Sequence, residues 1–201
     1  MEKKDNPLRR TLERLKEYNE IAGIVDMARR YFANNAFDGV LTIIGVLSGN
    51  YAAGVDDPHI VVTTGLTTSI AIGISGLWGA FLTESAERKR EMDELNQSTL
   101  SDLNGSKIGK ASRFAAVAVS IVDGLSPFLS SIIVLFPFFF ANLFPDITYV
   151  YFSAIGFALL VLFGLGVFLG NISRQNLILS GIKTLAAGAV SILISNLLGN
   201  S

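Results

Sequence analysis

Two aspartates lie inside long apolar runs of the sequence, and glycine follows each of them. Asp38 lies within the run Ala36–Val46, and Asp123 lies within Val122-Asp123-Gly124-Leu125. An ionised carboxylate in hydrocarbon costs about 2.5 kcal/mol or more, so it is seldom placed there without a partner or a function. Carboxylates bind hard divalent cations and also carry protons. We predict that both acids are functional; the alternative is a structural acid held by neighbouring Ser, Thr or backbone groups.

The two aspartates are expected at similar depth in a membrane. Asp38 lies eight residues beyond Arg30, and Asp123 lies ten residues beyond Arg113. At about 1.5 Å per helical residue, each acid is roughly 12–15 Å from the nearest basic residues. On two helices that run in the same direction, these acids are predicted to converge on one site.

A stripe of glutamates follows the second apolar run. Their spacing of three, four and three residues places them on one face of a helix; they are Glu84, Glu87, Glu91 and Glu94. We predict that this stripe gathers divalent cations at the cytoplasmic mouth of a pore. The alternative is a solvated helix in which Glu84 pairs with Arg88 and Glu87 with Arg90.

The composition favours a membrane protein and excludes several other classes. Of 201 residues, 50% are hydrophobic and 16% are charged, whereas soluble domains carry about 25% charged residues. The net charge of -1 leaves no electrostatic footprint for nucleic acid. Cysteine is absent, and the sequence contains no nucleophile elbow, phosphate loop or zinc-protease signature. We therefore predict no enzymatic activity and no bound cofactor.

Five apolar segments are each near the roughly 20 residues that a helix needs to cross a bilayer. They cover about 36–55, 59–84, 114–141, 147–170 and 177–199. Asp56-Asp57-Pro58 separates the first two segments, because proline does not continue a helix. A turn there is preferred over a cation site built from Asp56, Asp57 and His59. The predicted fold is an all-α, multi-pass protein of the cell membrane with five transmembrane helices.

The basic residues predict the orientation of these helices. In a five-span arrangement all 16 Lys and Arg fall on one side of the membrane. Eight precede the first span, six lie between the second and third, and two flank the turn between the fourth and fifth. The positive-inside rule then places the N-terminus in the cytoplasm and the C-terminus outside.

The charged segments outside the spans form two predicted regions. Residues 1–35 form an amphipathic N-terminal helix at the membrane surface, or alternatively a solvated leader helix. Its apolar positions recur every three to four residues: Leu8, Leu12, Leu15, Ile21, Ile24, Val25 and Ala28. Residues 85–113 form a short, charged cytoplasmic insert, in which 96–112 resemble a loop.

Two prolines interrupt the third span. Pro127 and Pro137 leave backbone carbonyls without their helical donors. Such carbonyls can line a polar cavity, or the prolines can simply kink the helix against a neighbour.

With these motifs in order, the chain resembles the vacuolar iron transporter family. The first span carries Asp38-Gly39, then Thr42, then Gly45-Val46 at the spacing of that family. Further matches are Ile74-Ser75 and Gly79 in the second span, the two prolines of the third, and Ser180-Gly181 in the fifth. The similarity covers roughly residues 29–199.

The resemblance implies a dimer of five-helix protomers that exports Fe²⁺ or Mn²⁺ from the cytoplasm in exchange for protons. Asp38 matches the pore aspartate of that family. Three positions depart from its pattern: Gly76 stands where the pore methionine is expected, Ala80 replaces a glutamate, and Phe37 replaces an asparagine. A thioether favours softer metals, so its loss bears on metal selectivity.

The leading hypothesis is a proton-coupled transporter of divalent metal. Asp38 would be the pore ligand and proton carrier, Asp123 its partner, and the glutamate stripe the cytoplasmic mouth. The expected partners are Fe²⁺ or Mn²⁺ as substrate, protons, the bilayer and a second copy of the chain, but no nucleic acid. The alternatives are a membrane scaffold or regulatory protein that transports nothing, and a transporter of another small solute.

Overall fold

The computed structural model describes residues 7–199, and every regular element in that range is a helix. The first six residues, with Lys3 and Lys4, and the last two lie outside the described range, as does the side chain of Leu8. The elements are α1 (Pro7–Ala22), α2 (Ile24–Ala52), α3 (Pro58–Thr99), α4 (Lys107–Leu135), the 3-10 helix η1 (Phe136–Leu143), α5 (Ile147–Ile172) and α6 (Leu177–Gly199).

Polar caps fix where three of the helices begin. The Asp57 carboxylate accepts a hydrogen bond from the backbone N–H of His59 at 2.9 Å, and Asp146 accepts one from Thr148 at 2.7 Å. Ser106 caps α4 by accepting from Gly109. Such side-chain oxygens satisfy N–H groups that have no partner within the helix. The turn interpretation of Asp57 and His59 is therefore confirmed.

The N-terminal region is divided differently from the prediction. Gly23 adopts a left-handed conformation with φ of 60° and separates α1 from α2. Glycine adopts this conformation without steric cost. Residues 24–35 are not part of a separate leader helix, because α2 continues from Ile24 through Asp38 without a break.

The charged insert at 85–113 is largely helical. The α3 helix runs on to Thr99 and α4 already begins at Lys107, so the predicted loop is restricted to the turn between them. Pro127 lies within α4, whereas Pro137 lies at the start of η1, where the α-helical geometry ends.

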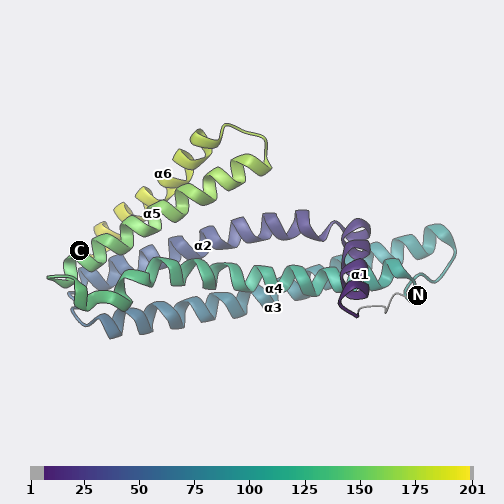
Figure 1. Cartoon of the computed structure of the whole chain (residues 1–201), viewed down its shortest axis with the longest axis horizontal. Helices are drawn as coiled ribbons and strands as arrows, with labels where there is room; N and C mark the ends of the chain where they lie inside the picture. Colours follow the sequence, from purple (N-terminus) through teal and green to yellow (C-terminus); the bar gives the residue numbers. More distant parts are fainter. Residues whose placement is uncertain (1–6, 200–201) are drawn as a thin grey trace, which may run out of the picture.

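The long helices lie side by side, as Figure 1 shows. The α2, α3 and α4 helices form one layer, and the α5–α6 hairpin packs on α2 and diverges from the layer at its connecting turn. The short α1 helix lies across the layer and packs on α4. Tyr18 contacts Phe114 there with ring centroids 5.7 Å apart, while Leu12 and Leu15 remain exposed.

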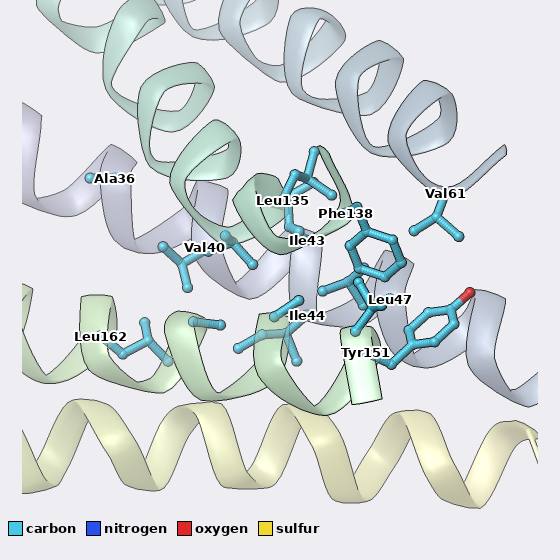
Figure 2. Close-up of a cluster of buried hydrophobic side chains, with 14 of the residues drawn as sticks. Ala36, Val40, Ile43, Ile44, Leu47, Val61, Leu135, Phe138, Tyr151 and Leu162 are labelled. Carbon is cyan, nitrogen blue, oxygen red and sulfur yellow. The ribbon is translucent and has the colours of Figure 1, made fainter. Parts of the chain in front are cut away.

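The apolar core gathers at the end of the bundle opposite α1 (Figures 1 and 2). Ile43, Ile44 and Leu47 of α2 are fully buried between α4 and α5. Phe138 of η1 stacks edge-on with Tyr151 at a centroid distance of 5.0 Å, and the Tyr151 hydroxyl donates to the Val55 carbonyl. This cluster fixes α2 against its neighbours.

Within the described residues, four helical segments are long and apolar enough to cross a membrane. They are Pro58–Thr99, Lys107–Leu143, Ile147–Ile172 and Leu177–Leu197. The α2 helix is not among them, and its apolar part is interrupted by Asn35, Asp38 and Asn50. Large apolar side chains on the other helices face outward, including Trp78 at 61% exposure and Leu160 at 70%. The fold is thus all-helical and has the composition of a membrane protein.

Candidate functional site

The α2 and α4 helices approach closely beside the two aspartates. A Cβ atom on Gly39 would lie 2.5 Å from the Pro127 carbonyl oxygen, so only glycine fits there. The Ser130 hydroxyl of α4 donates to the Ala36 carbonyl of α2 at 2.9 Å, and Ser131 reaches the Gly39 carbonyl. Such hydrogen bonds and small residues are how helices associate in a membrane. Because the two helices run in the same direction, this contact brings the two aspartates to neighbouring turns.

Asp38 opens on a pocket of about 420 Å³ between α2, α3 and α4. The pocket is lined by Asn35, Asp38, Ala71, Ile72, Ser75, Gly76 and Pro127. The Thr42 hydroxyl bonds the backbone carbonyl of Asp38 at 2.8 Å, not its carboxylate. Among the described residues, none donates a hydrogen bond to the Asp38 carboxylate or forms an ion pair with it.

Asp123, by contrast, is buried and accepts a hydrogen bond from a neighbouring side chain. Its side chain is 6% exposed. The Asn35 amide donates to its Oδ1 and also to the Tyr31 carbonyl, the latter at 2.8 Å. Asn35 also lines the Asp38 pocket, so this one side chain links the two acids, whereas Asp123 is not among the residues that line that pocket.

A second polar cluster joins α2 to α3. The Tyr31 hydroxyl donates to Glu84 Oε1 at 2.7 Å, and Arg88 Nε lies 3.4 Å from Glu84 Oε2 without forming a hydrogen bond. Arg88 Nη2 donates to the Met27 sulfur at 3.2 Å. The hydrogen bond to Glu84, assisted by burial, raises the pKa of Tyr31 to about 12. The expected pairing of Glu84 with Arg88 is confirmed.

This cluster borders a second pocket of about 570 Å³ between α2, α3 and the end of α5. It is lined by Met27, Arg30, Tyr31, Asn34, Glu84, Glu87, Arg88, Glu91, Leu169, Ile172 and Ser173. Three members of the glutamate stripe thus face one cavity, together with a thioether.

The fourth glutamate lies apart. Glu94 pairs with Arg90 at 3.0 Å, and both side chains are well exposed. Arg90 pairs with Glu94 in place of the expected Glu87. In the part of the chain that the structure describes, no three His, Asp or Glu side chains come close enough to hold a metal ion. A single chain therefore presents acids in two pockets without a complete carboxylate cage.

The two pockets are joined by a short series of polar contacts. Asp38 and Asn35 line the first pocket, Asn35 bonds both Asp123 and the Tyr31 carbonyl, and the Tyr31 hydroxyl bonds Glu84 in the second. Sequence reasoning missed Asn35 and Tyr31. Tyr31 lies four residues before Asn35, and Asn35 lies three residues before Asp38. This spacing places all three on the same face of α2, which was an available signal.

Over the residues that the structure describes, the protein is all-helical, has four helices long and apolar enough to cross a membrane, and carries on α2 an acid that opens on a pocket beside α3 and α4. No family model matches the chain. It is 38% identical over 168 residues to Uncharacterized protein MJ0645 of Methanocaldococcus jannaschii, an alignment that covers 82% of this chain and 84% of that protein. The chain belongs to the same family as this archaeal protein.

Proposed function

We propose that this protein is a multi-pass transporter of the cell membrane that moves a divalent metal ion, Fe²⁺ or Mn²⁺, out of the cytoplasm in exchange for protons. The observation that carries the proposal is the Asp38 carboxylate, which opens on a pocket and has no hydrogen-bond or ion-pair partner among residues 7–199. In a bilayer this charge is costly unless a cation or a proton neutralises it. Alternate occupancy of Asp38 by metal and by proton provides the exchange.

The proposal includes α2 as a fifth span. The α2 helix packs along α4, α5 and α6, and its fully buried residues lie among these apolar helices. A helix enclosed in this way crosses the bilayer with its neighbours, although polar residues interrupt it. With five spans the basic residues of α1, of the first turns of α2, of the ends of α3 and α4 that flank their turn, and around the α5–α6 turn share the cytoplasmic side. The α1 helix then lies at the membrane surface with Leu12 and Leu15 toward lipid.

Because the chain has no cysteine, single introduced cysteines test this topology. Glu20→Cys and Asp56→Cys should react with an impermeant maleimide from opposite faces of sealed vesicles. Labelling from the same face would mean that α2 does not cross, and the five-span arrangement would be wrong.

The metal route in this proposal runs between the two pockets. Glu84, Glu87 and Glu91 attract the ion from the cytoplasm, and it then moves along Tyr31 and Asn35 to Asp38. Carboxylate and carbonyl oxygens are ligands that suit Mn²⁺. Glu94 lies outside this route because it pairs with Arg90.

The exposed position of Asp38 supports a homodimer. The pocket opens on the outer surface of the single chain. Alongside it α3 presents Ile70, Ile74 and Trp78, which are 48%, 64% and 61% exposed. A second copy that packs on this surface shields the acid from lipid and adds the missing ligands from its own pocket.

Mn²⁺ uptake into proteoliposomes with an imposed proton gradient tests the function. Asp38→Asn should abolish uptake, since the neutral amide neither balances the metal charge nor exchanges a proton. Asp56→Asn, an exposed acid in the α2–α3 turn, is the matched control and should transport as the natural chain does. Unchanged uptake in Asp38→Asn would rule out the pore role.

A membrane scaffold or regulatory protein is the second candidate. It is favoured by the absence, among the described residues, of three ligating side chains in one place. In that case the purified protein would show no metal-dependent increase in melting temperature. Transport of a different small solute would instead leave Asp38 essential while Mn²⁺ and Fe²⁺ fail to compete.

A further inference from the structure

Gly76 of α3 lies directly against the buried Asp123 of α4. A Cβ atom at position 76 would be 2.9 Å from Asp123 Oδ2 and 3.4 Å from its backbone carbonyl oxygen. One turn further along the same helix, a Cβ atom at Gly79 would have nothing within 4 Å. The missing side chain at position 76 therefore leaves space that the Asp123 oxygens occupy.

These Asp123 oxygens have unused bonding capacity. Oδ1 accepts from Asn35, but among the described residues none donates a hydrogen bond to Oδ2, although the side chain is only 6% exposed. The backbone carbonyl of Asp123 would pair with the N–H of residue 127 in a regular helix. That residue is Pro127, which has no N–H. Two oxygen acceptors of one residue thus lie beside Gly76: among the described residues Oδ2 has no hydrogen-bond donor, and the carbonyl lacks its usual i+4 donor.

Gly76 also lines the pocket that contains Asp38, Asn35 and Ser75. The polar atoms gathered around it are carboxylate, amide, hydroxyl and carbonyl groups. The thioethers of Met27 and Met92 line other pockets, and the single His59 lies in the first turn of α3, at the far end of that helix. No sulfur or imidazole from the described residues reaches this pocket.

We propose that Gly76 determines metal specificity: by leaving position 76 empty, it lets Asp123 Oδ2 join Asp38 in an all-oxygen site for a hard divalent cation such as Mn²⁺. Two carboxylates balance the charge of such an ion. Oxygen ligands suit Mn²⁺, whereas soft ions such as Cd²⁺ gain from sulfur. This inference rests on the proposed transport function and assigns the chemical class of its substrate.

The test compares Gly76→Ala with Gly79→Ala in the purified full-length protein. Mn²⁺ binding is measured from the electron paramagnetic resonance signal of the free ion. The new methyl group at position 76 displaces Oδ2, which is the end of a flexible side chain, so the helices stay packed. We expect Gly76→Ala and Asp123→Asn each to weaken Mn²⁺ binding about tenfold or more, as losses around metal ligands do. Gly79→Ala should bind as the natural chain does.

The outcomes separate this inference from the proposed function. If Asp38→Asn weakens Mn²⁺ binding while Gly76→Ala and Asp123→Asn do not, the site exists without Asp123 and this inference is wrong. If the natural chain does not bind Mn²⁺, or Asp38→Asn leaves binding unchanged, the transport proposal fails with it. Should Gly76→Ala fail to fold, Asp123→Asn decides alone.

Competition with Cd²⁺ tests the oxygen-only chemistry. An equal concentration of Cd²⁺ is expected to displace no more than about half of the bound Mn²⁺, since no thioether or thiolate favours it. Displacement of nearly all the Mn²⁺ would mean that a soft ligand completes the site, and the all-oxygen assignment would be overturned.

Discussion

The two halves of α2 have different surroundings although they form one continuous helix. In the half after Asp38, Val40, Ile43, Ile44 and Leu47 are fully buried against neighbouring helices (Figure 2). In the half that ends at Asp38, polar side chains border two pockets and bond across to α3 and α4. The apolar half fixes the position of the helix, and the polar half borders the pockets in which we propose that a metal ion binds.

Because of this difference, substitutions in the two halves should change different measured properties. Changes in the apolar half should alter stability with little effect on the chemistry of each folded molecule. Changes in the polar half should alter binding and protonation with little effect on stability. The following predictions test that separation.

The largest loss of stability is expected from Leu47→Ala. Truncating this fully buried side chain should lower the free energy of unfolding by roughly 2–5 kcal/mol, because the cavity that remains loses its packing contacts. Leu160→Ala, at a side chain that is 70% exposed, is the control. The measurement is denaturant unfolding in detergent, and equal losses in the two variants would contradict the assignment of the core.

Gly39→Ala should have the next largest effect. Its new methyl group meets the Pro127 backbone at 2.5 Å, and separating α2 from α4 should cost about 1–3 kcal/mol. Gly45→Ala places a methyl group with nothing within 4 Å and should be neutral or slightly stabilising. Thermal unfolding of the pair measures the difference. Because Gly39 lies at the junction of the two halves, this variant should also weaken Mn²⁺ uptake. Full uptake by a destabilised Gly39→Ala protein would mean that the α2–α4 contact does not position the Asp38 site.

The smallest effect is spectroscopic and concerns Tyr31. Its bond to Glu84 holds the phenol proton and raises the pKa of Tyr31 to about 12. Glu84→Gln removes the negative charge, so the tyrosinate should form at lower pH, which a difference titration of tyrosinate absorbance detects. Glu94→Gln, at an exposed acid paired with Arg90, should leave that titration unchanged. No shift in Glu84→Gln would mean that the contact between α2 and α3 is absent in solution.

Much of the helical layout could be predicted from sequence because local chemistry determines it. Asp57 and Asp146 precede apolar runs, and each caps the helix that follows. The start of α2 could not be placed in this way, because the polar stretch before Asp38 looks the same whether it ends a surface helix or continues into the bundle. The break lies at Gly23, whose left-handed conformation separates α1 from α2, and α2 then continues through Asp38.

The candidate site was predictable only in part. Asp38 and Asp123 are conspicuous because acids are rare in apolar runs. Asn35 and Gly76 are ordinary residue types whose importance depends on what faces them from another helix. The family resemblance already marks Gly76 as lacking the expected methionine, but its contact with Asp123 is visible only in the structure.

The most direct test of the central claim is anomalous scattering from crystals of the full-length protein soaked in Mn²⁺. We predict a manganese peak bound by oxygens of Asp38 and Asp123 beside Gly76. Crystals that show no peak there, or show manganese only among the exposed glutamates of α3, would contradict the account.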